Sequence, residues 1–314
     1  MQTFYDVFGL VIRSDFTLEA LSEATLSEAA ALQRKDQKPE LVVRRVSGLK
    51  RPEQHSHDPF FDITPEVQYM HWQAVGTFVV RSADLVEIEP GDGIDDHLVS
   101  QPLLGLVMSI VLERRGVLCL HAGAVNIRGR AALFLGDKGA GKSTTCAMLL
   151  NTGALPITDD LVAVETTETG KAHIRPGFSR MKLWPDSIAA LNLSATAADV
   201  QVHPKISKIQ KAMPQMVEQT PVPAACGFFL NRSQDVTQLE VSRLAPHEAL
   251  PLLMRFTFMA RYGESRLGRD HLIAHMRRCS AFVAKVPMHR LDIPEDLSQL
   301  PALSQVIQET VEHV

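Results

Sequence analysis

Residues 136–143 read Gly-Asp-Lys-Gly-Ala-Gly-Lys-Ser, and this stretch decides the fold that the sequence predicts. It matches the phosphate-binding pattern G-x-x-x-x-G-K-[ST], in which glycines let backbone N–H groups turn toward a phosphate. Residues 130–135 precede it as an apolar run of strand character, and residues 144–150 follow as the opening turns of a helix. The motif requires this context of strand, glycine loop and helix. An α/β nucleotide-binding fold is therefore predicted, and a chance match is the alternative.

The loop predicts ATP and Mg²⁺ as cofactors. Lys142 would reach the outer phosphates and the Ser143 hydroxyl would hold Mg²⁺, while the partial positive charge at the helix start would favour a bound phosphate. The residues expected to bind the nucleotide, through backbone or side chain, are Gly136, Asp137, Lys138, Gly139, Ala140, Gly141, Lys142, Ser143 and Thr144.

The composition is that of a globular protein of one large or two ordinary domains. The chain has 314 residues, of which 45% are hydrophobic and 22% charged, so a core can form. A net charge of −4 gives no reason to expect a nucleic-acid partner, and the absence of a run of eighteen apolar residues excludes a membrane-spanning helix. The four cysteines are far apart, which argues against a zinc site or disulfide framework. Together with an N-terminus unlike a signal peptide, they favour a cytoplasmic location.

The first third of the chain is distinct from the rest. Residues 8–12, 41–46, 76–81 and 85–90 have strand character, and residues 91–96 mark a boundary. We therefore expect a strand-rich N-terminal substrate or partner module over residues 1–97 and a nucleotide-binding domain over residues 98–314. Within the second domain the pattern predicts strands at 117–121, 123–127, 154–157, 161–165 and 225–230, and helices at 103–115, 247–261, 269–284 and from 297 onward.

Two further features narrow the function. Asp159 and Asp160 follow a short apolar strand, where nucleotide-binding domains of this kind keep a second Mg²⁺ contact. One carboxylate can then ligate the metal while the other accepts a proton from an attacking hydroxyl; a solvated turn is the alternative. His121 ends another apolar strand, where a histidine is either structural or functional.

These residues together resemble a known family. The run from Leu120 to Ser143, followed by Leu155-Pro-Ile-Thr-Asp-Asp-Leu-Val162, is similar to the core of HPr kinase/phosphorylase, the bacterial enzyme that phosphorylates a serine of the sugar-transport protein HPr. That core shows His-Gly, a strand, Gly-Asp-Ser-Gly-x-Gly-Lys-Ser, a helix and Ala-Asp-Asp-Arg-Val at similar spacing. The resemblance implies a P-loop domain of the HPr-kinase type, which is also the PEP-carboxykinase-like type. It further implies that Asp159 is the catalytic base, that Asp160 supports Mg²⁺, and that His121 and Lys142 lie beside the reacting groups.

The departures from this family concern the substrate. The glutamate-bearing signature Glu-x-Arg-Gly-Leu-Gly has no counterpart, and the equivalent stretch is Arg175-Pro-Gly-Phe-Ser-Arg-Met-Lys-Leu-Trp-Pro-Asp186. This stretch resembles HPr-kinase-related proteins of peptide-modifying gene clusters, which include kinases that phosphorylate lasso-peptide precursors at the C-terminal residue. The resemblance implies an ATP-dependent serine kinase whose substrate is a peptide or small protein.

Several points stay open at this level. Arg175, Arg180, Lys182, Arg255 and Arg261 are candidates for an additional cation at the site. Trp184 is either a core residue or part of a peptide-binding ledge, and Lys205, Lys208 and Lys211 would share one face if they lay on a helix. The alternatives for function are a bifunctional kinase/phosphorylase, a small-molecule hydroxyl kinase and a non-catalytic nucleotide-gated adaptor. Nucleic-acid and membrane partners are not expected, and a homo-oligomer is open.

Overall fold

The computed structural model describes residues 2–27, 30, 39–49, 58–178, 180–203, 206–213, 220–261, 268–295 and 300–314. The chain has a mixed α/β structure with several sheets. It forms two compact units, one of residues 1–117 with 261–274 and the other of residues 118–260 with 275–314. The sequence predicted a domain boundary at residue 97, and that boundary stays a prediction. In the structure, residues 98–117 belong to the same compact unit as the N-terminal strands.

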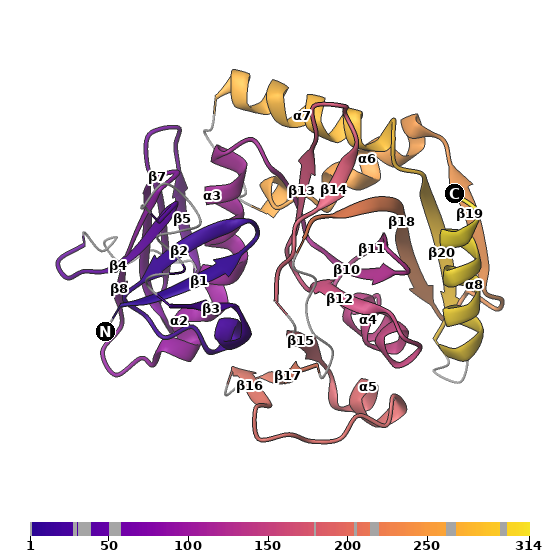
Figure 1. Ribbon diagram of the computed structural model, residues 1–314, viewed down its shortest axis with the longest axis horizontal. Helices are drawn as coiled ribbons and strands as arrows, with labels where there is room; N and C mark the ends of the chain where they lie inside the picture. The colour runs from indigo at the N-terminus through magenta and orange to yellow at the C-terminus, as the bar shows by residue number, and fades with distance from the viewer. Residues whose placement is uncertain are drawn as a thin grey trace. The chain divides into compact units, whose positions relative to one another are not determined.

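The first unit contains an eight-stranded sheet in the order β3-β1-β2-β4-β8-β7-β6-β5 (Figure 1). Its strands are β1 Thr3–Val7, β2 Leu10–Ser14, β3 Thr25–Leu26, β4 Leu41–Arg45, β5 Phe60–Ile63, β6 Gln68–Trp72, β7 Gly76–Ser82 and β8 Leu85–Pro90. Its helical segments are η1 Glu19–Ala24, α2 Asp96–Pro102, η2 Leu103–Val107 and α3 Met108–Arg114. Asp95 caps α2, because its carboxylate accepts a hydrogen bond from the Leu98 N–H at 2.8 Å. The strands predicted near residues 41, 76 and 85 are confirmed. The expected strand at 8–12 instead begins at Leu10, because Phe8 and Gly9 adopt positive φ angles in a turn.

The second unit is built on a nine-stranded sheet in the order β12-β10-β11-β18-β14-β13-β9, with β20 beside β18 and β19 beside β20. The central strands β11, β18 and β20 are parallel. Residues 131–135 of β11 are all buried, as expected for a strand covered on both faces. The bounds are β9 Leu118–Leu120, β10 Ala122–Ile127, β11 Arg130–Leu135, β12 Leu155–Thr158, β13 Val162–Thr166, β14 Ala172–Ile174, β18 Val222–Ser233, β19 Glu240–Leu244 and β20 Met288–Pro294.

Helices cover both faces of this sheet (Figure 1). The segments are α4 Lys142–Asn151, α5 Pro185–Ala190, α6 Pro246–Arg255, η3 Met259–Arg261, α7 Arg269–Val283 and α8 Leu300–Glu312. Alternate residues of β11 point to opposite faces of the sheet. Phe134 packs with α4 and α8 on one face, whereas Leu133 and Leu135 pack with α6 and α7 on the other. Among the described residues, none of the helices combines the length and apolar character that a bilayer crossing requires.

A small second sheet of the same unit has the order β15-β17-β16, with β15 Arg180–Leu183, β16 Val200–His203 and β17 Ile206–Ala212. Lys208 and Lys211 therefore lie on a strand, and not on a helix that would place them on one face; Lys205 lies outside the described residues. Spacing by three fits a helix, but β17 pairs with a strand on either side, and residues three apart on a strand point to opposite faces.

The helix expected at residues 247–261 is shorter than predicted. It begins at Pro246 and ends at Arg255. The next backbone groups bond to β9 and its continuation: the Phe256 carbonyl accepts from the His121 N–H at 2.7 Å, and the Phe258 N–H donates to the Cys119 carbonyl at 3.0 Å. This pairing replaces further helical turns.

Candidate functional site

The loop of residues 136–141 joins β11 to α4, as the sequence predicted (Figure 1). Gly139 and Gly141 have φ angles of 93° and 96°, a region that favours glycine. Gly136 is needed for space, because a Cβ there would lie 2.9 Å from the Ala140 Cβ and 3.1 Å from the Leu230 carbonyl oxygen. The loop conformation therefore depends on all three glycines, and it leads directly into the N-terminus of a ten-residue helix.

Lys142 lies across this loop. Its ammonium donates hydrogen bonds to the carbonyl oxygens of Gly136 at 2.8 Å and Asp137 at 3.2 Å, and the residue is 9% exposed. The charge is thus held beside the backbone that would surround a phosphate. The Thr144 hydroxyl forms a 2.9 Å hydrogen bond with the Ser187 hydroxyl of α5. Contact of Thr144 with a nucleotide would therefore use its backbone N–H.

Ser143 contacts a buried carboxylate. Its hydroxyl lies 3.0 and 3.1 Å from the two carboxylate oxygens of Asp159, which is 4% exposed. The Lys182 backbone N–H also donates to Asp159, at 3.1 Å. Burial, together with the neighbouring charge of Asp160, raises the pKa of Asp159 to about 6. The predicted loop serine and one predicted carboxylate therefore meet.

A bend in two paired strands brings His121 and the two aspartates together. Leu120 of β9 pairs with Val162 of β13 before the bend, and Ala124 of β10 pairs with Thr158 of β12 after it, in the same antiparallel register. The two segments stay paired with each other, but the regular strand pairing is interrupted over the three residues between these pairs. His121 therefore lies opposite the turn that carries Asp159 and Asp160.

Gly123 allows close packing at this bend. A Cβ at Gly123 would lie 2.7 Å from the Cys146 sulfur and 3.5 Å from an Asp159 carboxylate oxygen. On the opposite strand, Asp160 has a φ of 67°, in the left-handed region, and its carboxylate pairs with Lys182, whereas that of Asp159 contacts Ser143. The two carboxylates consequently have different surroundings.

Asp160 lies among positive groups. The Lys182 ammonium is 2.7 Å from its carboxylate, and the His121 Nδ1 donates to its backbone carbonyl at 3.1 Å. Burial acts to raise the pKa of Asp160, but the charges of Lys182 and His121, with a smaller contribution from Lys208, hold it well below its usual range. The His121 ring also packs edge-on against Phe258, with centroids 5.8 Å apart.

Of the five predicted cation candidates, two lie at the site. Lys182 contacts the carboxylates, and the Arg255 guanidinium lies 2.8 Å from both carboxylate oxygens of Asp137 in the loop. The contacts given for two others are with other groups: Arg175 pairs with Glu165, and Arg180 donates to the Ala198 carbonyl. Arg261 belongs to the first unit.

The sequence analysis missed Arg232, which follows the buried part of β18. Its guanidinium lies 4.0 Å from the position that a Cβ of Gly141 would occupy. The strand topology, which the sequence pattern alone does not give, is what indicates that Arg232 lies near the loop. Because β18 is parallel to β11, its carboxyl end lies at the same edge of the sheet as the phosphate loop, where ligands of open α/β sheets bind.

The described residues contain no group of three or more histidine, cysteine, aspartate or glutamate side chains that could hold a metal ion by themselves. Mg²⁺ is typically bound by one or two carboxylates together with nucleotide phosphates and water, so the site fits this ion. The hard oxygen donors in contact are the Ser143 hydroxyl and the Asp159 carboxylate. Asp160, which the sequence predicts as a metal ligand, forms an ion pair with Lys182, and its role as a ligand stays a prediction.

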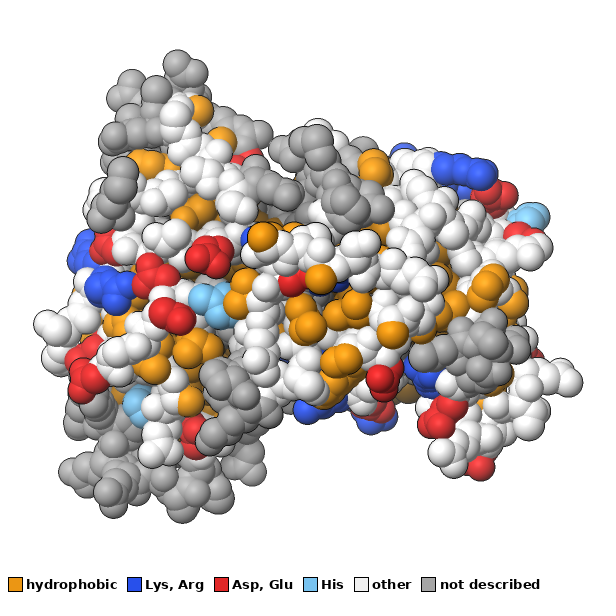
Figure 2. Space-filling view, turned by 90° about the horizontal axis from the view of Figure 1, so that it is seen from below, with side chains coloured by type: hydrophobic (Ala, Val, Ile, Leu, Met, Phe, Trp, Pro, Cys, Tyr) orange, Lys and Arg blue, Asp and Glu red, His pale blue; other side chains and the backbone are white. Residues whose placement is uncertain are grey.

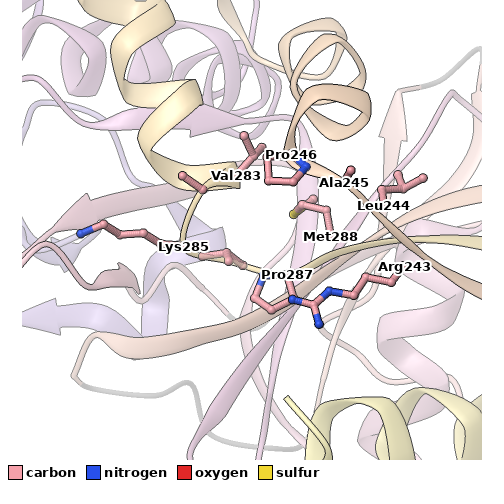
Figure 3. Close-up of a pocket in the computed structure, with 10 residues that line it drawn as sticks. Arg243, Leu244, Ala245, Pro246, Val283, Lys285, Pro287 and Met288 are labelled. Carbon is pink, nitrogen blue, oxygen red and sulfur yellow. The ribbon is translucent and has the colours of Figure 1, made fainter.

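A separate pocket of about 310 Å³ lies where α6 begins, α7 ends and β20 begins (Figure 3). Arg243, Pro246, Val283 and Met288 are among its lining residues. The lining contains no carboxylate, hydroxyl, thiol or imidazole side chain, and none of the predicted site residues contributes to it. Because Met288 starts β20, the pocket lies at the amino ends of the parallel strands, whereas the phosphate loop follows the carboxyl end of β11.

Comparison with family models and with curated proteins gave no match. Among solved structures, the Hpr(Ser) kinase/phosphatase from Coxiella burnetii is similar over 62% of this chain and 94% of that chain, with 10% sequence identity and a TM-score of 0.29. A likeness at this level carries no argument about the chemistry of this chain.

Proposed function

We propose that this protein is a Mg²⁺- and ATP-dependent kinase that transfers the γ-phosphate to a serine or threonine hydroxyl of a peptide or small protein. The observation that carries the proposal is the contact between Ser143, directly after the loop lysine, and the buried carboxylate of Asp159. A loop that binds phosphates, a lysine across it and a carboxylate against its serine are the parts that phosphoryl transfer requires.

The loop and the helix start would bind the β- and γ-phosphates through backbone N–H groups, with Lys142 moving from the loop carbonyls to the phosphate oxygens. Mg²⁺, when bound, neutralises charge on these oxygens. Ser143 and Asp159 would hold it, because they already contact each other at the end of the loop.

The contacts favour a division of roles between the carboxylates that differs from the one the resemblance implies. Asp159 lies on the metal side with Ser143, whereas Asp160 lies beside His121 and Lys182, where an acceptor hydroxyl would approach. The acceptor oxygen attacks the γ-phosphorus, the bond to the β-phosphate oxygen breaks, ADP leaves, and the hydroxyl proton passes to the Asp160 carboxylate. Because the transition state is loose, positioning of the hydroxyl matters more than strong basicity.

The decisive test is incubation with ATP, Mg²⁺ and peptides encoded beside this gene, including any lasso-type precursor with a C-terminal serine, followed by mass spectrometry. We expect one added phosphate on a serine or threonine, and no product with Lys142→Ala. ATP binding without transfer to any peptide or small hydroxyl compound would refute the kinase proposal and favour a nucleotide-gated adaptor.

Two asparagine variants distinguish the roles of the carboxylates. Asp159→Asn should raise the Mg²⁺ concentration needed for half-maximal activity, because a metal ligand is lost. Asp160→Asn should lower kcat at saturating Mg²⁺ and leave that concentration unchanged. The reverse pattern would support the roles that the resemblance implies.

A further inference from the structure

The small sheet presents one face away from the core. Lys182 pairs with Gln210 and Leu183 with Ile209 in antiparallel register, so Trp184, which directly follows β15, comes opposite Lys208. Residues opposite each other or two apart share a face of a sheet. Lys182, Trp184 and Lys208 therefore lie on one face, which we term the lysine–tryptophan face.

The other face of β15 is committed to the core. Met181 and Leu183 are each 1% exposed and belong to the cluster that includes α4 and α8. Trp184, in contrast, is 37% exposed. The view from below looks toward the small sheet and α5, and hydrophobic side chains are open to view there among polar ones (Figure 2). An exposed tryptophan offers a large apolar surface for contact with a ligand.

This face adjoins the proposed reaction site. Lys182 contacts Asp159 through its backbone N–H and Asp160 through its ammonium. The Lys208 ammonium lies 5.5 Å from the centre of the Trp184 ring, near enough to Asp160 for its charge to act on that carboxylate. Within the part of the chain that the structure describes, no carboxylate forms an ion pair with Lys208.

We infer that the lysine–tryptophan face is the acceptor subsite, and that it selects a peptide segment with a carboxylate on the phosphorylated residue or on the residue that follows it. The inference rests on the proposed function and names its substrate class. Charge complementarity is the argument: Lys208 supplies a half-buried cation beside an exposed aromatic surface, at the side of Asp160 where the hydroxyl approaches. The Trp184 ring would contact the apolar part of the segment, and Lys208 its carboxylate.

The carboxylate could be a side chain or a chain terminus, and a peptide series separates these sources. The five peptides share one sequence up to the serine. In three of them the serine is followed by glutamate, glutamine or lysine and the C-terminus is amidated. In the other two the serine is the last residue, with either a free or an amidated C-terminus. We expect kcat/KM to be at least about tenfold higher for the carboxylate peptides than for their neutral partners, as a charged hydrogen bond implies. Whether glutamate or the free terminus gives the larger ratio identifies the source.

The Lys208→Glu variant tests the residue. It should lose the preference and favour the lysine peptide, while the KM for ATP stays unchanged. Lys171→Glu, an exposed lysine between β13 and β14, is the matched control and should behave as wild type. Equal loss of transfer to all five peptides would mean that Lys208 serves the phosphate, and this would overturn the inference. So would a wild-type enzyme without any preference.

A binding measurement separates this inference from the proposed function. Trp72 and Trp184 are the two tryptophans of the chain, so in the Trp72→Phe variant Trp184 alone reports by fluorescence. Carboxylate peptides should change its emission without ATP, and Lys208→Glu should abolish the change. Such binding without phosphate transfer would support the subsite and refute the kinase proposal. Phosphate transfer without preference and without a fluorescence change would refute the subsite and leave the kinase proposal intact.

Discussion

Asp159→Asn should stabilise the metal-free protein at neutral pH, although it weakens phosphate transfer at limiting Mg²⁺. The carboxylate is 4% exposed, and burial with the charge of Asp160 raises its pKa from 3.8 to about 6. At about 1.4 kcal/mol for each pKa unit, ionised Asp159 destabilises the folded protein by roughly 3 kcal/mol at most. Asparagine carries no charge and keeps one oxygen that can accept from Ser143 or from the Lys182 N–H. The net gain should be about 1–3 kcal/mol at pH 7.5.

The pH dependence follows from the sign of the shift. A carboxyl group with a raised folded-state pKa binds its proton more tightly in the folded than in the unfolded chain. Its stabilising contribution is therefore complete below the unfolded value of 3.8 and is lost as the pH rises through about 6. The free energy of unfolding of the wild type, compared with that of Asp159→Asn, should therefore fall between these two pH values. Above about pH 7 the difference between the two proteins should stay constant.

Urea unfolding followed by circular dichroism, with EDTA present and at intervals from pH 4 to 8, measures this difference. Asp186→Asn, at an exposed carboxylate of α5, is the matched control for the loss of one negative charge. If the free energies of unfolding of wild type and Asp159→Asn differ by the same amount at every pH, the carboxylate does not carry the raised pKa, and the reasoning is refuted.

Three other outcomes are expected. Gly123→Ala should lower the free energy of unfolding by about 1–3 kcal/mol, because the added Cβ would lie 2.7 Å from the Cys146 sulfur. Gly105→Ala, with no atom within 4 Å of the new Cβ, should not lower it, and equal losses would contradict the packing argument. Burial, with the charge of Asp159, raises the pKa of the Cys146 thiol. Iodoacetamide, followed by mass spectrometry, should therefore label Cys146 only after denaturation. Labelling of the native protein would show an accessible thiolate and contradict this prediction. Arg255→Ala should change the free energy of unfolding by less than about 1 kcal/mol, since its pair with Asp137 is exposed, and a larger loss in urea unfolding would reveal a further structural role.

The sequence predicted the local part of the site well. The conformation of the loop at residues 136–141 depends on eight neighbouring residues, because its glycine positions and the start of the following helix are set locally. The sequence also predicted that Asp159 lies near this loop. Asp159 follows β12, which is separated from the loop strand β11 by β10 alone, and its carboxylate contacts Ser143.

The different surroundings of the two aspartates could not be read from the sequence. Asp159 contacts Ser143 and Asp160 pairs with Lys182, and two adjacent identical residues do not reveal which of them makes which contact. The strand that carries Lys208 and Lys211 was not predicted for a related reason. Their spacing fits a helix, but pairing of β17 with β15 decides the conformation, and pairing partners are distant in sequence.

Lys182 serves the two carboxylates through different parts of the residue: the backbone N–H donates to Asp159, and the ammonium pairs with Asp160. Any exchange of the side chain other than to proline keeps the first contact and alters the second. Under the proposed roles, natural variation at position 182 would alter the carboxylate assigned to the acceptor hydroxyl and preserve the one assigned to the metal. Acceptor preference would then diverge during evolution without change at the proposed nucleotide site.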